Sequence, residues 1–473
     1  MTISRRPLTA LLVLTLGLVV SEKSNAASFT WDASGASPTA PTDGPGFWST
    51  SNANWAGGGS DSGWNNGANN DAVIGNSGTG VGNSINITTN ITANSLLFRS
   101  VSSAYTVTST NASVLTLTSG TVTANITATI NAIVSGTNGF SKIGNGTVGL
   151  GAVATYTGTT YILGGSLQNR VVNALPTSTV VAIGLSGSNA SATLDVRSNQ
   201  TVAGIVAVGS TPSTNFISNT QTASTTLTIN PDSAGGAAAD STFTGIIKNG
   251  DATHILSLTK AGSHTLTLTG SNSYTGTTTV TAGSLIINGS LSGSSAVTVA
   301  SAGRLGGTGT IGGISVSGTL GAGNGSIGTL NTNDLAINAT GALENEFGRS
   351  GVTPVSDVIS VTGTVSLLSG ANLQLSLTGS TPLNGDIFYL LNNDLSDAVT
   401  GVFTKLNGVN TTLNQDSIFS FNSQSFQISY NATFGSSFTG GNDIAIKVVP
   451  EPATCALAGL GAVALLWRRR RIS

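Results

Sequence analysis

Residues Lys260–Leu285 read KAGSHTLTLTGSNSYTGTTTVTAGSL, an alternation of apolar residues with Thr or Ser that small residues interrupt. The same order occurs in Lys142–Leu167, KIGNGTVGLGAVATYTGTTYILGGSL, and the two stretches align without a gap. Alternation with a period of two predicts strands that have one buried and one solvated face. One such unit buries little by itself, so stacked units that share a core, a parallel β-solenoid, are favoured. A sandwich of several antiparallel sheets is the competing architecture.

Short alternating segments of this kind fill residues 84–338, and Gly, Asn and Ser punctuate them as tight turns require. No amphipathic helix is expected between residues 27 and 448, so the predicted class is all-β. If the two copies are structural repeats, Tyr156 should be equivalent to Tyr274, and Leu167 should be equivalent to Leu285. Both Leu side chains should then point inward, because a slip of one residue would turn them to the opposite face.

The order Lys-x-Gly, Tyr-Thr-Gly-Thr-Thr and Gly-Ser-Leu resembles the autotransporter-associated β-strand repeat of bacterial surface proteins. The stretches Ser295–Ile311 and Val316–Gly323 resemble the usual continuation of that repeat. This resemblance implies a right-handed β-helix passenger. An autotransporter would end in a membrane barrel of alternating strands. We expect no room for one after these repeats, and therefore no self-translocation.

Two flanking regions differ from the repeats in composition. Residues 27–83 hold four of the five Trp, and we expect an N-terminal cap in which Trp side chains plug the first coil. A sugar-stacking platform is the alternative, since exposed aromatic rings can bind apolar sugar faces. Residues 339–447 gather aromatic residues late, and we expect a C-terminal β cap that covers the open core. The Trp residues concerned are Trp31, Trp48, Trp55 and Trp64.

The start of the chain has the pattern of a secretory signal peptide over residues 1–26. Arg5 and Arg6 precede an apolar run, and Ser24-Asn25-Ala26 supplies a small-x-small cleavage site around Ser24 and Ala26. The apolar run is short for a membrane span of about 20 residues. We therefore expect export, with an uncleaved membrane anchor as the alternative.

Residues 448–473 form the most diagnostic segment. The motif Val449-Pro450-Glu451-Pro452 precedes an apolar run from Cys455 to Trp467, and a basic stop follows it. This order resembles the PEP-CTERM sorting signal of Gram-negative exopolysaccharide-producing bacteria. It implies processing by an exosortase-type enzyme after transient anchoring in the inner membrane through a short C-terminal transmembrane helix. A plain tail anchor without processing is the alternative. The basic stop consists of Arg468, Arg469, Arg470 and Arg471.

Composition argues against several classes of function. The formal net charge is −2 and charged residues make up 8% of the 473-residue chain, whereas nucleic-acid binding needs a basic footprint. Carboxylates are sparse, and Asp232, Asp240 and Asp251 fit turn formation better than a catalytic site. His254 and His264 lack partners at metal-ligand spacing, so we expect outward-facing side chains, no metal and no cofactor.

Together these features predict an exported structural or adhesive protein of the cell surface or extracellular matrix, not an enzyme, with extracellular polysaccharide as a candidate partner. A β-helix polysaccharide lyase or hydrolase is the alternative. It would need converging carboxylates on one face of the solenoid.

Overall fold

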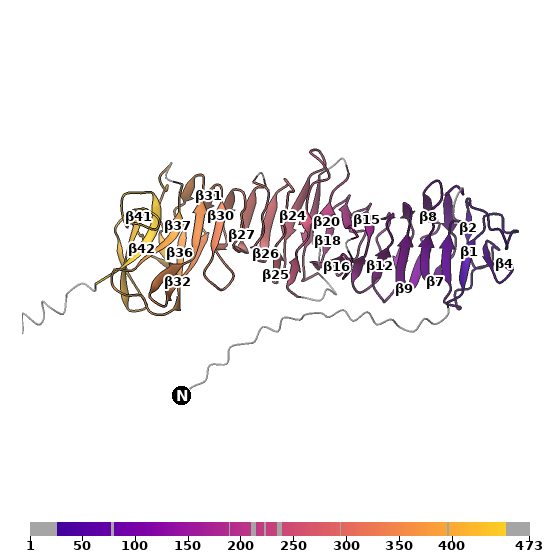
Figure 1. Ribbon diagram of the computed structural model, residues 1–473, viewed down its shortest axis with the longest axis horizontal. Coiled ribbons are helices and arrows are strands. Elements are labelled where there is room, and N and C mark those ends of the chain that lie inside the picture. Colours follow the sequence, from indigo (N-terminus) through magenta and orange to yellow (C-terminus); the bar gives the residue numbers. More distant parts are fainter. Residues whose placement is uncertain are drawn as a thin grey trace, which may run out of the picture.

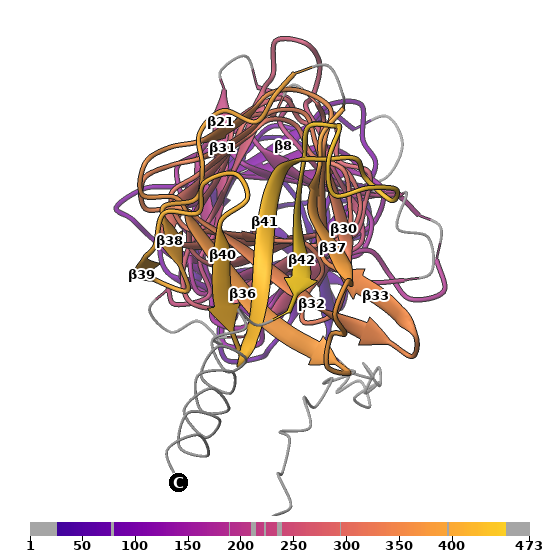
Figure 2. The same ribbon diagram turned by 90° about the vertical axis from the view of Figure 1, so that its left-hand side faces the viewer.

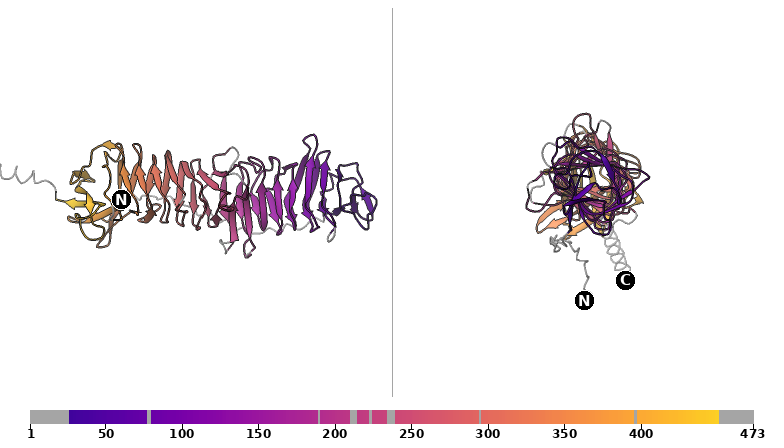
Figure 3. Two further views of the ribbon diagram at one scale, coloured as in Figure 1. Left: turned by 90° about the horizontal axis from the view of Figure 1, so that it is seen from above. Right: turned by 90° about the vertical axis from the view of Figure 1, so that its right-hand side faces the viewer.

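The computed structural model describes residues 26–450, apart from residues 77–79, 189, 210–213, 222–223, 234–238, 294 and 395–396. The described part of the chain is all-β, and its strands are stacked along one long axis, with β1 and β42 at opposite ends (Figure 1). Seen from above, successive strands cross the rod at regular intervals (Figure 3). The all-β prediction is confirmed.

Two sheets build the N-terminal half of the stack. The first contains β1 (Ser28–Trp31), β3 (Trp55–Gly57), β4 (Ser60–Ser62), β5 (Asp71–Ile74), β7 (Ile91–Phe98), β9 (Val114–Ala124), β11 (Ile133–Ser135), β12 (Phe140–Ile143), β14 (Thr160–Ile162), β16 (Val180–Ile183) and β19 (Gly204–Ala207). The second contains β2 (Gly46–Trp48), β6 (Ser84–Ile87), β8 (Tyr105–Ser109), β10 (Ala128–Ile130), β13 (Thr147–Leu150), β15 (Gly165–Asn169), β17 (Ala192–Val196), β20 (Asn215–Ser218) and β23 (Ile246–Ile247).

Two further sheets build the C-terminal half. The larger contains β18 (Gln200–Val202), β21 (Thr225–Ile229), β22 (Ser241–Phe243), β24 (Leu256–Lys260), β25 (Thr265–Leu268), β26 (Thr278–Ile287), β27 (Val297–Gly306), β28 (Ile314–Val316), β29 (Thr319–Gly321), β31 (Leu335–Ile337), β32 (Ala342–Ser350), β33 (Thr353–Ser356), β35 (Val365–Leu367), β36 (Asn372–Gly379), β38 (Lys405–Leu406) and β39 (Val409–Asn410). The smaller contains β30 (Thr329–Thr332), β34 (Val358–Val361), β37 (Ile387–Asn392), β40 (Ile418–Phe421), β41 (Gln424–Ala432) and β42 (Asp443–Val449).

The register of these ladders explains the alternation in the sequence. Along the second sheet the parallel pairs place apolar residues of successive strands directly above one another. All members of this column are fully buried, whereas the residue directly before each of them is partly exposed. Each coil therefore closes the core of the coil before it, as a solenoid requires. The column consists of Val148, Leu167, Leu194, Ile217 and Ile247.

Antiparallel pairing is concentrated at the two ends of the stack. At the N-terminal end β3 pairs with β1 and β4, and at the C-terminal end β42 lies between β37 and β41. Viewed along the axis, β40, β41 and β42 lie across the C-terminal end of the rod (Figure 2). The parallel-rich sheets are consistent with the predicted solenoid. Its right-handed sense stays a prediction.

Parallel pairing runs across both of the boundaries that the sequence suggested for the caps. Strand β2 pairs in parallel with β6 and β5 with β7 across the first boundary, and β29 pairs in parallel with β32 across the second. The division into residues 27–83, 84–338 and 339–447 therefore stays a prediction. Among the described residues no helix is long and apolar enough to cross a membrane. The expected membrane segment Cys455–Trp467 lies outside those residues.

Candidate functional site

The two sequence signals lie directly beside the ends of the folded body. Ala26, at the predicted cleavage site, stands two residues before β1. At the other end Val449 makes the last pair of the β41–β42 ladder, opposite Ser425, and Pro450 is exposed. Of the predicted sorting motif only Val449 and Pro450 belong to the described residues. Glu451, Pro452, the apolar run and the four Arg lie outside them, as does Ser24. The structure therefore brings the start of the motif to the surface at the end of a central strand.

A buried lysine marks each of the two repeat copies. Lys142 and Lys260 are fully buried, each in a column of apolar core residues. The Lys142 ammonium donates to the carbonyls of Ile143 (3.1 Å), Gly144 (2.7 Å) and Gly164 (2.9 Å). The third carbonyl belongs to the next coil, so the lysine joins two coils at a corner of the solenoid.

Lys260 repeats this arrangement at equivalent atoms. Its ammonium donates to Ala261 (2.6 Å), Gly262 (2.9 Å) and Ala282 (3.2 Å). Burial lowers the pKa of each lysine to about 8. A protonated amine has three donors, and here all three meet carbonyl oxygens. The sequence carried a signal for this burial, because Lys142 stands two positions after the core residue Phe140.

A tyrosine and a glycine also recur at equivalent places. Tyr156 and Tyr274 are buried, and each hydroxyl shares a hydrogen bond with the Thr hydroxyl four residues later, at 2.6 and 2.7 Å. Gly165 and Gly283 both have φ near +64°, and a Cβ there would lie within 2.4 Å of a backbone carbonyl oxygen of the preceding coil. Only glycine fits such a position. The next residue but one is buried in both copies: Leu167 and Leu285 are fully inaccessible. The predicted equivalence is confirmed.

The four N-terminal tryptophans lie inside the first coils. None of them is more than 2% exposed, and the Trp48–Trp55 and Trp55–Trp64 ring centroids are each 4.7 Å apart. Trp31 Nε1 donates to the carbonyl of Gly44 and Trp64 Nε1 to that of Thr92. The rings therefore form a core. The sugar-stacking alternative is wrong for these residues, because no ring face is open to a ligand.

The three carboxylates considered for an enzyme site are engaged with backbone and hydroxyl groups, two of them on the neighbouring coil and one within its own loop. Asp232 accepts from the backbone and hydroxyl of Ser263, and Asp240 accepts from the amide of Thr265. Asp251 accepts from Thr253 and from the backbone of His254. None of these contacts brings two of the three carboxylates together.

Both histidines pair with carboxylates and are partly exposed. His254 Nδ1 lies 2.6 Å from Asp251, and His264 Nδ1 lies 3.5 Å from Asp240. Among the described residues no three His, Cys, Asp or Glu side chains gather as metal ligands would. Two hollows in the surface, one beside Trp64 and one beside Ser166, are lined without any Asp or Glu. Elsewhere, Asp61 lies beside Asp32, and burial together with that neighbouring charge raises the pKa of Asp61.

Two buried carboxylates that sequence reasoning did not single out organise the C-terminal end. Asp357 accepts from the amides of Gly328 and Glu346, and burial raises its pKa to about 6. Asp443 accepts from the amides of Asn393 and Phe434, both at 2.6 Å, and burial raises its pKa as well. Both side chains are almost inaccessible. They tie loops to strands, and the nearby carboxylates of Glu346 and Glu344 add to the rise of the Asp357 pKa that burial causes.

Comparison with known proteins matches the same three segments. Residues 140–168 and 258–287 match the family described as Passenger-associated-transport-repeat, and residues 448–471 match the PEP-CTERM protein-sorting motif. The chain is 29% identical over 202 residues to "Adhesin BmaC autotransporter" of Brucella suis biovar 1 (strain 1330). That match covers 41% of this chain and 6% of the relative. The chain thus carries a PEP-CTERM sorting motif together with passenger-associated repeats, as the sequence patterns predicted.

Proposed function

We propose that this chain is an exported structural or adhesive protein of the cell surface or extracellular matrix, sorted through its C-terminus and associated with exopolysaccharide. The observation that carries the proposal is the sorting motif at residues 448–471, which begins where the last strand of the folded body ends. A motif so placed is presented to a processing enzyme without unfolding the solenoid. In this proposal an exosortase-type enzyme acts near the motif, after residues 1–26 have directed export.

The solenoid suits a structural or adhesive role. Its strands stack into a long rod, so the two ends of the body lie far apart (Figure 1). The charged fraction is only 8%, and outward positions carry mainly Thr, Ser and Asn, which can hydrogen-bond to glycans without strong electrostatics. The partial match to an adhesin named as an autotransporter supports an adhesive rather than a catalytic role. The N-terminal region 27–83 and the region 339–447 would act as caps that protect the ends.

The sorting step is tested in the native host with two variants. Replacing Pro450, Glu451 and Pro452 together by Ala should leave export intact and keep the protein in the membrane fraction. Truncation after Val449 should release soluble protein, because it keeps the last ladder pair with Ser425 and removes the apolar run. Recovery of the triple variant from the extracellular matrix at the wild-type level would refute the proposal. Circular dichroism of both variants controls for loss of the fold.

A further inference from the structure

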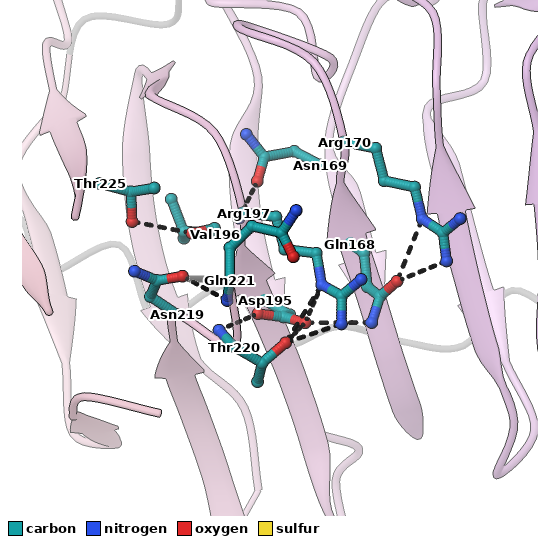
Figure 4. Close-up of polar contacts among 10 residues, drawn as sticks. All are labelled: Gln168, Asn169, Arg170, Asp195, Val196, Arg197, Asn219, Thr220, Gln221 and Thr225. Atoms are coloured by element: carbon teal, nitrogen blue, oxygen red, sulfur yellow. Dashed lines mark hydrogen bonds and ion pairs between the residues drawn. The ribbon is translucent and has the colours of Figure 1, made fainter. Parts of the chain in front are cut away.

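Two arginines stand side by side on the outer face of the second sheet. Arg170 directly follows β15 and Arg197 directly follows β17, and these strands pair in register up to Asn169 and Val196. Adjacent strands lie about 4.8 Å apart, so the two side chains leave neighbouring coils at the same height. Figure 4 shows both guanidinium groups on the same face of the sheet, in one network of polar side chains.

The first arginine is held in place from two sides. Arg170 Nε and Nη2 donate to Oε1 of Gln168, at 3.2 and 2.9 Å, and Gln168 is itself 8% exposed. Beneath the guanidinium lies Gly149 of β13, where an added Cβ would come within 2.3 Å of Arg170 Nε. The absence of a side chain at Gly149 therefore gives the Arg170 head its position.

The second arginine is held by a buried carboxylate. Arg197 Nε donates to Asp195 Oδ2 at 2.9 Å, and Nε and Nη2 both lie within 3.1 Å of the Thr220 hydroxyl. Asp195 is 2% exposed and also accepts from the amide of Thr220. Gln168 Nε2 donates to the Asp195 carboxylate at 3.0 Å (Figure 4). This bond joins the residue that holds Arg170 to the residue that holds Arg197 in one network.

This network leaves cationic donors unused. Within the described residues, Nη1 of Arg170 and Nη1 of Arg197 have no hydrogen-bond acceptor. One carboxylate, that of Asp195, faces two guanidinium groups, so the network carries a net positive charge in a chain whose net charge is negative. Arg170 is exposed to solvent. Planar guanidinium groups with free N–H donors match the oxygens of a carboxylate or phosphate.

Neutral hydroxyl groups lie on the same sheet, before Gln168 and Asp195 along the ladder. Thr147, Ser166 and Thr193 pair across β13, β15 and β17. Each stands two positions before a residue that positions an arginine, namely Gly149, Gln168 and Asp195. The three hydroxyl groups contribute to an open hollow of about 510 Å³ whose lining contains no charged side chain. Hydroxyl groups can both donate to and accept from the hydroxyls of a sugar.

We propose that Arg170 and Arg197 bind the carboxylate groups of an acidic polysaccharide, whose sugar hydroxyls contact the hollow lined by Ser166 and Thr193. The inference rests on the proposed function, since it names the class of glycan that the surface recognises. A uronic-acid polymer offers both a carboxylate and a row of hydroxyls. A nucleic acid fits less well, because the hollow carries no aromatic side chain on which bases could stack.

The test measures binding of the purified folded body, residues 27–449, to alginate, a polyuronate, by calorimetry at low and moderate salt. Carboxyl-reduced alginate and dextran serve as neutral probes, and single-stranded DNA serves as the competing polyanion. The double variant Arg170→Gln/Arg197→Gln should weaken alginate binding about tenfold or more, because two charge-assisted contacts are lost. Arg99→Gln/Lys405→Gln changes the net charge equally on other coils and should leave binding unchanged.

Gly149→Ala gives a sharper variant because it alters no charge. The new Cβ would displace the Arg170 side chain, so the affinity for alginate should fall. The extended backbone of β13 accepts Ala, so the melting temperature should stay near that of the wild type. Equal losses in the site variant and the Arg99→Gln/Lys405→Gln control would overturn the inference, as would equal affinity for dextran or tighter binding of DNA.

The proposed function can survive the loss of this inference. If the body fails to bind alginate but the full chain is still sorted and recovered with the native matrix, only the arginine site is refuted. If the chain is not found at the surface or in the matrix, the proposed function fails whatever the alginate result.

Discussion

The two repeat copies share their buried lysine, tyrosine and leucine and differ in the three residues that follow the leucine. Each copy buries a lysine on three carbonyls, a tyrosine bonded to a threonine and an inward leucine. After the leucine the first copy continues Gln168-Asn169-Arg170, whereas the second continues Ile286-Ile287-Asn288. The first of these segments carries the arginine network, and both isoleucines of the second are fully buried. The repeated residues thus specify the coil, and the positions after them are free to carry a function.

The largest effect is expected from the buried lysines. Lys142→Ala or Lys260→Ala removes the aliphatic stem from the core and leaves three carbonyls without their donor. Each change should lower the free energy of unfolding by about 3 kcal/mol. Denaturant unfolding measures the loss, and hydrogen exchange locates it in the affected coils.

Lys142→Met and Lys260→Met serve as matched controls for that prediction. Methionine refills most of the volume, so each should cost less than the Ala change, about 1 to 2 kcal/mol. A large loss in one copy and none in the other would break the equivalence of the two interiors.

The next effect concerns pH. Each lysine has a pKa of about 8 in the folded chain and 10.5 when unperturbed. Between these values the unfolded chain binds more protons, so the free energy of unfolding should rise with pH. From pH 7.5 to 9.5 the rise should be about 1 to 2 kcal/mol per lysine. Melting curves of the wild type and the Lys142→Met/Lys260→Met variant at both pH values give the lysine contribution. A fall in stability with rising pH in the wild type alone would contradict the lowered pKa of the two lysines.

A smaller, equal effect is expected from the tyrosine hydroxyls. Tyr156→Phe and Tyr274→Phe each remove one buried hydrogen bond while Thr160 and Thr278 keep their second hydroxyl partners. Each should cost about 1 kcal/mol in the free energy of unfolding. If the two losses differed by a factor of two or three, beyond experimental error, the copies would not be equivalent.

The smallest effect belongs to the outer face. Arg170→Gln should change the free energy of unfolding by less than about 0.5 kcal/mol, because the side chain is exposed and its support stays in place. Chemical denaturation tests this directly. A loss as large as that of Lys142→Ala would show that the arginine maintains the coil, and the contrast between interior and surface would then fail.

The sequence predicted the repeat geometry well because period-two alternation and the matched Tyr, Gly and Leu determine which side chains face inward. It did not predict that Lys142 is buried, since a charge is normally expected outside and only the carbonyls of two coils make burial tolerable. The arginine network was also missed. Arg170 and Arg197 are distant in sequence, and only the register of β15 against β17 brings them together.

The extent of parallel pairing could not be read from composition either. The Trp-rich region appeared different from the repeats, yet β1 and β2 already pair in parallel with later strands. At the other end, Asp357 accepts from the amide of Gly328, 29 positions away, and Asp443 accepts from that of Asn393, 50 positions away. Such contacts depend on tertiary structure, and no local sequence pattern predicts them.

The most direct test of the sorting proposal is mass spectrometry of the mature protein recovered from extracellular material. We expect an N-terminus at Ala27 and a C-terminus near Pro450–Pro452, with the apolar run and the four Arg removed. Recovery of an intact terminus that still contains Trp467 to Arg471 would contradict it.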